Sequence, residues 1–205
     1  GLSDCVRLFT EKPPRGAAHN FGLAAYQFWA EMLTSPKGRL SWAKVFPPGL
    51  PMYAGLSGAL QFPFIFGKGL DSDAERGTFA TFLEEAATIL GAPALIEAAN
   101  HFRASAEAWQ QLPRILLPDH IPPFAKTRQL AWRRHESFLW QGNAALEEMH
   151  AIDQELAAIR RSMVEDFHLT ESEAGDLREQ IAEQVLLIRG LEKQAIDVLK
   201  EALAR

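Results

Sequence analysis

The sequence predicts an all-α protein, a multi-helix orthogonal bundle with a long antiparallel C-terminal helical hairpin. Two observations carry this prediction. Apolar residues recur at helical spacing in most segments, and proline and glycine cluster at the points between those segments. The alternating pattern of strands is scarce. We therefore expect a single all-helical domain over residues 1–205, with a compact core in 1–118 and a hairpin in 119–205 that packs on it.

The first third of the chain divides at proline and glycine clusters. The run Lys-Pro-Pro-Arg-Gly at residues 12–16 separates a short first segment from a helix predicted over residues 18–33, which ends before Pro36 and Gly38. A short helix is expected between residues 40 and 46, because Pro47, Pro48 and Gly49 follow it. Residues 50–66 are apolar almost throughout, which predicts a buried central helix.

The middle of the chain predicts two consecutive helices. The loop at residues 67–73 ends in side chains that favour a helix start, and Asp73 and Glu75 suit the positive end of the next helix dipole. That helix opens at Arg76. Gly91 is typical of the residue after a helix, and Pro93 suits the first turn of the following one.

The last third of the chain predicts the hairpin. Pro113, Pro118 and the pair at residues 122–123 mark an irregular connection, after which residues 124–167 form one long, charged, amphipathic pattern. Thr170 and Glu173 have the spacing of a capping box and predict the start of the last helix. Apolar residues line one face of that helix: Leu177, Ile181, Val185, Ile188, Leu191, Leu199 and Ala202. The two long helices should pair antiparallel.

Composition and charge exclude several classes of function. The chain has a net charge of −5 and no basic stripe, so we expect no nucleic-acid partner. The longest apolar run is interrupted by Pro63 and is shorter than the roughly 20 residues that a membrane span needs. A single cysteine, Cys5, forms neither an internal disulfide nor a zinc site by itself. We expect a cytoplasmic protein with no membrane contact.

Two Glu-x-x-His elements are candidate metal ligands. Glu147 with His150, and Glu165 with His168, each have the spacing of the ligands in carboxylate-bridged di-metal helical proteins. Such a site needs these elements on different helices, whereas here they fall within one predicted helix or its end. We therefore expect no metal and no cofactor, and a metal-dependent helical oxidase is kept as a third hypothesis.

Other ligand motifs are incomplete. Asp71, Asp73 and Glu75 have the spacing of a calcium loop, but Arg76 stands where that loop requires glycine, so helix capping explains these carboxylates better. Gly67-Lys68-Gly69 lacks the downstream residues of a phosphate-binding loop.

The single cysteine, Cys5, is either a nucleophile or an inert thiol. Cys5 could pair with His19 or His101 as nucleophile and base, but no recognisable motif surrounds it, so we expect no catalytic residue.

One arginine and one glutamate are prominent on the helix that begins near residue 76. Arg76 and Glu85 lie about two and a half turns apart, so each needs a partner from elsewhere in the chain. Either Arg76 forms a structural ion pair or it contacts a ligand.

The aromatic run at residues 62–66, with Trp29, Trp42, Met52 and Tyr53 nearby in sequence, also leaves two interpretations open. It forms either core or an apolar pocket that receives a partner domain or an acyl chain.

The stretch between Gly67 and Trp109 resembles a known family. An arginine, an aromatic residue, Phe-Leu-x-Glu-Ala and a later tryptophan follow in order at Arg76, Phe79, residues 82–86 and Trp109. His-Asn-Phe-Gly-Leu at residues 19–23 and Leu-Glu-Lys-Gln-Ala at residues 191–195 extend the similarity over most of the chain. The pattern is similar to the C-terminal domain of unknown function of butirosin biosynthesis protein BtrH-like proteins.

The resemblance implies a function and a set of site residues. It implies a bacterial natural-product protein that passes an acyl group from a carrier-protein thioester to an amine, with catalysis in an N-terminal cysteine-bearing domain outside this chain. The expected partners are that domain, an acyl carrier protein and an amine-containing small molecule. The expected substrate-binding residues are Arg76, Phe79, Glu85, Trp109 and Glu192. The alternative is a non-catalytic helical interaction module that forms a homodimer.

Overall fold

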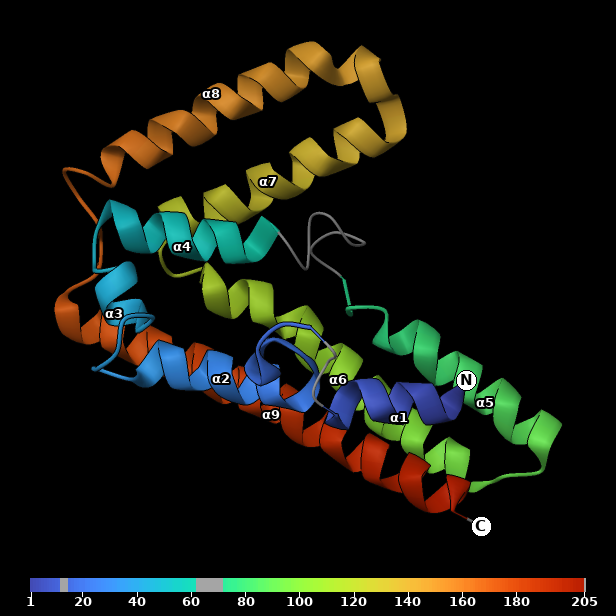
Figure 1. The fold of residues 1–205 in the computed structure, drawn as a ribbon. Coiled ribbons are helices and arrows are strands. Elements are labelled where there is room, and N and C mark those ends of the chain that lie inside the picture. Colours follow the sequence, from blue (N-terminus) through green and yellow to red (C-terminus); the bar gives the residue numbers. More distant parts are fainter. Residues whose placement is uncertain (12–14, 62–71, 205) are drawn as a thin grey trace. The chain divides into compact units, whose positions relative to one another are not determined.

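The computed structural model describes residues 1–11, 15–61 and 72–204. These residues form helices and contain no strand, which confirms the predicted all-α class (Figure 1). The chain divides into two compact units, and α2, α6 and α9 contribute residues to both. Unit 1 comprises Gly1–Met32, Asp73–Trp109 and Ala182–Arg205, and unit 2 comprises Leu33–Ser72 and Gln110–Ile181. The expected division at residue 118 therefore does not match the packing.

Unit 1 is built from α1 (Leu2–Thr10), η1 (Ala18–Asn20), most of α2 (Gly22–Thr34), α5 (Arg76–Leu90), the first part of α6 (Ala94–Leu116) and the last part of α9 (Glu171–Leu203). Figure 1 shows α1 and α2 lying along α9 within this unit. Small residues let α5, α6 and α9 approach closely. The core that results contains Ala80, Leu83, Ala86, Ala87, Leu95, Ala98, Ala99, Phe102, Ala195, Ile196 and Leu199.

Unit 2 contains α3 (Trp42–Val45), α4 (Leu50–Leu60), α7 (Pro122–Gln141), η3 (Gly142–Ala145) and α8 (Leu146–Ser162). Helices α7 and α8 pack against each other and against α4 (Figure 1). The buried Tyr53 hydroxyl lies 2.8 Å from the hydroxyl of Thr127 and joins α4 to α7. The rings of Tyr53 and Phe124 lie 6.0 Å apart.

Several predicted boundaries are confirmed. Helix α5 ends at Leu90, and Gly91 follows with a φ of 61°, a left-handed conformation that glycine adopts readily. The backbone N–H of Thr170 donates to the Glu173 carboxylate, and the Glu173 N–H donates back to the Thr170 hydroxyl. The predicted capping box at the start of α9 is therefore present.

Two boundaries differ from the prediction. Pro113 lies inside α6, which continues to Leu116. Leu112, Leu116 and Leu117 are fully buried, and their burial offsets the roughly 3 kcal/mol that an interior proline costs. The pattern at residues 124–167 is two helices, since Gly142 takes a φ of 53° and turns the chain between α7 and α8. Helix α8 therefore has α7 as its hairpin neighbour.

The predicted central helix at residues 50–66 is present as α4 up to Leu60, with Met52, Tyr53, Leu56 and Leu60 buried. The remaining part of that prediction, including the aromatic run at residues 62–66, lies outside the described residues, as does most of the loop at residues 67–73.

Candidate functional site

The site of interest lies in unit 1 and begins at the N-terminus of α5. Asp73 caps this helix, because its carboxylate accepts hydrogen bonds from the backbone N–H groups of Glu75 and Gly77, both at 2.9 Å. Ala74 and Glu75 adopt left-handed conformations, with φ of 52° and 63°, as the chain turns into the helix. Arg76 Nη1 donates to the Ala74 carbonyl at 2.8 Å. The loop thus fixes the direction of the Arg76 side chain.

Glu192 is the centre of the polar network. It lies on the apolar stripe of α9 and is 0% exposed. Its Oε1 accepts from Arg76 Nε at 2.6 Å, from the Ser105 hydroxyl at 3.1 Å and from the indole N–H of Trp109 at 3.3 Å. Its Oε2 accepts from the Tyr26 hydroxyl at 3.0 Å and from Arg76 Nη2 at 3.3 Å. Helices α2, α5 and α6 therefore supply all of these donors to one buried carboxylate.

The protonation states follow from these contacts. Burial raises the pKa of Tyr26, and the negative charge of Glu192 raises it further, so this phenol stays protonated and donates. Burial alone would lower the pKa of Arg76, but the hydrogen bonds and charge of Glu192 outweigh burial and the net shift is upward. Burial also raises the pKa of the Cys5 thiol; nearby Arg76 opposes this and Glu192 adds to it. Arg76 and Glu192 therefore form a charged pair beside a neutral thiol.

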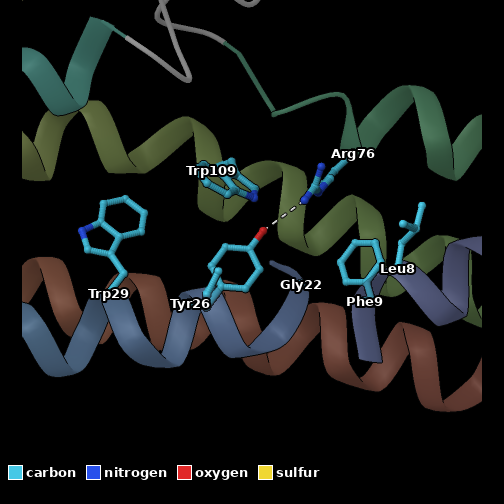
Figure 2. A pocket seen from close by; sticks show the side chains of 8 residues that line it. Leu8, Phe9, Gly22, Tyr26, Trp29, Arg76 and Trp109 are labelled. Atoms are coloured by element: carbon cyan, nitrogen blue, oxygen red, sulfur yellow. Dashed lines mark hydrogen bonds between the residues drawn. The ribbon is translucent and has the colours of Figure 1, made fainter. Parts of the chain in front are cut away.

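A hollow of about 420 Å³ lies next to this network. We call it the aromatic hollow; it is lined by Leu8, Phe9, Gly22, Ala25, Tyr26, Trp29, Arg76 and Trp109. Figure 2 shows the rings of Tyr26, Trp29 and Trp109 and the Arg76 guanidinium around one space. The Arg76 guanidinium lies 5.8 Å from the Phe9 ring centroid and 6.0 Å from that of Trp109. The hollow is within the size range of small-molecule sites.

The floor of the aromatic hollow requires glycine at position 22. Gly22 has a φ of 57°, and a Cβ there would lie 2.4 Å from the backbone oxygen of Phe9. The start of α2 can approach the end of α1 only because this side chain is absent. The glycine thus brings Phe9 and Tyr26 to the same hollow.

The structure brings three of the five expected site residues together. Arg76, Trp109 and Glu192 meet in the network. Phe79 instead packs in the core, where its ring lies 4.9 Å from that of Phe102 in an edge-to-face arrangement. Glu85 is exposed and does not line the aromatic hollow, so the structure does not bring it together with Arg76 and Glu192 as one site.

The physical reason lies in the helical period of α5. The buried stripe of this helix runs through Ala80, Leu83 and Ala87, and Glu85 lies off that stripe. Its neighbour Glu84 pairs with Arg103 on the surface.

Two members of the network were not expected from the sequence. Tyr26 and Ser105 donate to Glu192 from helices far away in sequence. One signal was present. Ser105 follows Phe102 by one helical turn on the buried face of α6, where an apolar residue would be ordinary. A small polar residue at such a position needs a partner inside the protein.

The residues considered for metal or nucleophilic chemistry lie outside this network. Glu147 and His150 are exposed on α8, and Glu165 and His168 lie in the non-helical connection after it. No group of three His, Cys, Asp or Glu side chains suited to a metal ion occurs in residues 1–11, 15–61 and 72–204. The His19 ring stacks on Phe28 with centroids 4.0 Å apart. The Asp73 carboxylate is used for capping, as expected.

Comparison with known proteins does not add a relative: no protein-family model, curated protein or solved structure matches this chain. Among the described helices, none combines the length and the apolar character that crossing a bilayer requires.

Proposed function

We propose that this chain is the helical, non-catalytic domain of a BtrH-like acyltransferase-related protein of bacterial natural-product biosynthesis. In this proposal its aromatic hollow binds the small-molecule or carrier-borne acyl substrate beside a separate cysteine-bearing catalytic domain. A cytoplasmic location is part of the same proposal, since a lone half-buried thiol such as Cys5 suits a reducing compartment.

One observation supports a binding role above all. Three side chains that line the aromatic hollow, Tyr26, Arg76 and Trp109, donate to the same buried carboxylate of Glu192. These three side chains are therefore held in place before any ligand binds, and a preorganised site loses less conformational freedom on binding. A structural ion pair alone would not require these side chains to border an open hollow.

The chemistry of the hollow favours binding over catalysis. The only described thiol near it, Cys5, has a raised pKa and is thus a weak nucleophile. The Glu192 carboxylate is buried under its hydrogen-bond donors and is not available as a general base. Arg76 can orient an oxygen atom of a ligand but cannot transfer a proton, because its pKa is raised.

The test uses S-butyryl-N-acetylcysteamine, a small thioester that mimics a carrier-bound acyl group. We expect saturable binding that shifts the indole N–H resonances of Trp29 and Trp109, with no acyl transfer to an added amine. Ala25→Phe fills the hollow and should abolish binding, whereas Ala24→Phe, at an exposed neighbouring position on α2, should not. Binding that survives Ala25→Phe, or efficient acyl transfer by this chain, would refute the proposal.

A second candidate function, homodimerisation, is favoured by a surface of unit 2. At the tip of the α7–α8 hairpin, Phe138, Leu139, Trp140 and Leu146 are 56%, 57%, 83% and 60% exposed. A cluster of exposed apolar side chains suits a symmetric contact with a second copy of the chain. Sedimentation equilibrium should then show a dimer that Trp140→Glu dissociates; a monomer at all concentrations would exclude this function.

A further inference from the structure

We infer that the aromatic hollow binds a flat apolar group that carries an oxygen acceptor, either a carboxylate or an acyl carbonyl, and that Arg76 donates to this oxygen. The inference rests on the proposed role of the hollow as a ligand site and names the chemical class of the ligand. It differs from the amine-containing small molecule that the resemblance implies as a partner.

Glu192 cannot receive an amine in this structure. Its side chain is 0% exposed, and its two oxygens already accept five hydrogen bonds. A carboxylate offers about four lone-pair sites, so its capacity is used. An ammonium group could reach it only by displacing Tyr26, Arg76 or Trp109, each of which is packed in place.

Arg76 presents the polar group that a ligand can reach. Its side chain is 23% exposed, and it lines the hollow. The Nε and Nη2 atoms donate to Glu192, and Nη2 also donates to the Tyr26 hydroxyl at 3.0 Å (Figure 2), while Nη1 donates one hydrogen bond within the described residues, to the carbonyl of Ala74. Since Nη1 carries two N–H groups, the second has no hydrogen-bond acceptor in residues 1–11, 15–61 and 72–204 and can donate to a ligand oxygen. Hydrogen bonds from a guanidinium to a carboxylate are among the strong ones.

The walls select a flat group. Phe9, Tyr26, Trp29 and Trp109 contribute rings to the lining, with the Tyr26 and Trp109 centroids 6.0 Å apart at an angle of 58° (Figure 2). Tilted aromatic walls pack well against another ring or a conjugated acyl group. The faces of Phe9 and Trp109 already lie near the Arg76 cation, so a second cation in the hollow would face like charge.

Three probes of similar size separate the possible ligand classes: benzoate, benzamide and benzylamine. They share one ring and differ in presenting a carboxylate, a carbonyl or an ammonium group. In calorimetric titrations of the whole chain at pH 7, we expect benzoate or benzamide to bind at least about tenfold more tightly than benzylamine. A preference for benzoate would indicate a free carboxylate as the natural group, and one for benzamide an acyl carbonyl.

Variants assign the preference to Arg76. Arg76→Lys keeps the charge but loses the planar set of donors, so the preference for benzoate or benzamide should fall about tenfold. Arg103→Lys is the matched control, because Arg103 also pairs with a glutamate of unit 1 but does so on the surface and should change nothing. Ala25→Phe replaces no member of the Glu192 network and should abolish binding of all probes, which keeps the test decisive where Arg76→Lys does not fold.

The binding results for these probes and for the thioester distinguish failure of this inference from failure of the proposed function. Benzylamine binding as tightly as benzoate and benzamide would overturn the inference and leave the hollow as a binding site. Failure of the probes and of S-butyryl-N-acetylcysteamine to bind would refute both.

Discussion

Removing the guanidinium of Arg76 should destabilise the protein by about 3 kcal/mol, because Arg76→Met leaves Glu192 as a buried charge without its counterion. Breaking a buried ion pair from one side costs about 3–5 kcal/mol. The lower end applies here, since Tyr26, Ser105 and Trp109 still donate to the carboxylate. With a urea m-value of about 2 kcal/mol/M, the unfolding midpoint should fall by about 1.5 M.

A double-mutant cycle in urea tests the reasoning. Glu192→Gln keeps one acceptor oxygen and should cost about 2 kcal/mol, and the double variant should cost less than the sum of the single variants by about 2 kcal/mol. Arg103→Met is the control: Arg103 and Glu84 are 45% and 36% exposed, so their pair should contribute about 0–1 kcal/mol. The reasoning would be refuted if the losses in free energy of unfolding of the two single variants added up in the double variant. It would also be refuted if Arg76→Met destabilised the protein no more than Arg103→Met.

Further predictions concern the backbone and two titratable groups. Gly22→Ala should lower the free energy of unfolding by about 2 kcal/mol, because Gly22 has a positive φ and a Cβ there would clash with the backbone of Phe9. Gly190→Ala in α9 should raise the free energy of unfolding by about 0.5–1 kcal/mol, because the space around Gly190 is open. Thermal unfolding checks both predictions. Burial lowers the pKa of His135, so an NMR titration of its ring should have a midpoint below 6.5. The unfolded chain then takes up this proton at higher pH than the folded chain, and stability should fall as the pH drops through about 6.5. Because burial raises the pKa of Cys5, iodoacetamide should alkylate it more slowly at pH 8 in the folded protein than in 8 M urea, and equal rates would contradict this.

Helix boundaries could be predicted where local chemistry decides them. Gly91 and the Thr170 capping box act through their own backbone conformation or through neighbours three residues away, and the sequence carries that information. Pro113 gave the wrong boundary because burial of the leucines around it, which depends on tertiary packing, outweighs the local cost. Gly142 was missed because a glycine inside an amphipathic pattern looks the same whether its φ is negative or positive.

The candidate site was predictable only in part, for the same reason. Arg76, Trp109 and Glu192 belong to motifs that the family resemblance singles out. The helical period also indicates that Glu192 is unusual, since it falls on the stripe that contains Ile188, Ile196 and Leu199. The partner of each polar side chain could not be predicted, because Glu192 contacts residues that lie 83 to 166 positions away in the sequence, among them Arg76 and Trp109.

The Glu192 network also couples formation of the site to folding of unit 1. An isolated carboxylate inside an apolar core is strongly unfavourable, so the position on α9 is tolerable only when its donors are in place. Those donors come from α2, α5 and α6, and three of them line the aromatic hollow. A partly assembled unit 1 would therefore bury the charge of Glu192 before all of its hydrogen-bond donors were in place, which is unfavourable. The walls of the hollow and the packing of these helices should consequently be lost together in unfolding, with the Trp109 indole resonance disappearing at the same urea concentration as the helical signal of unit 1.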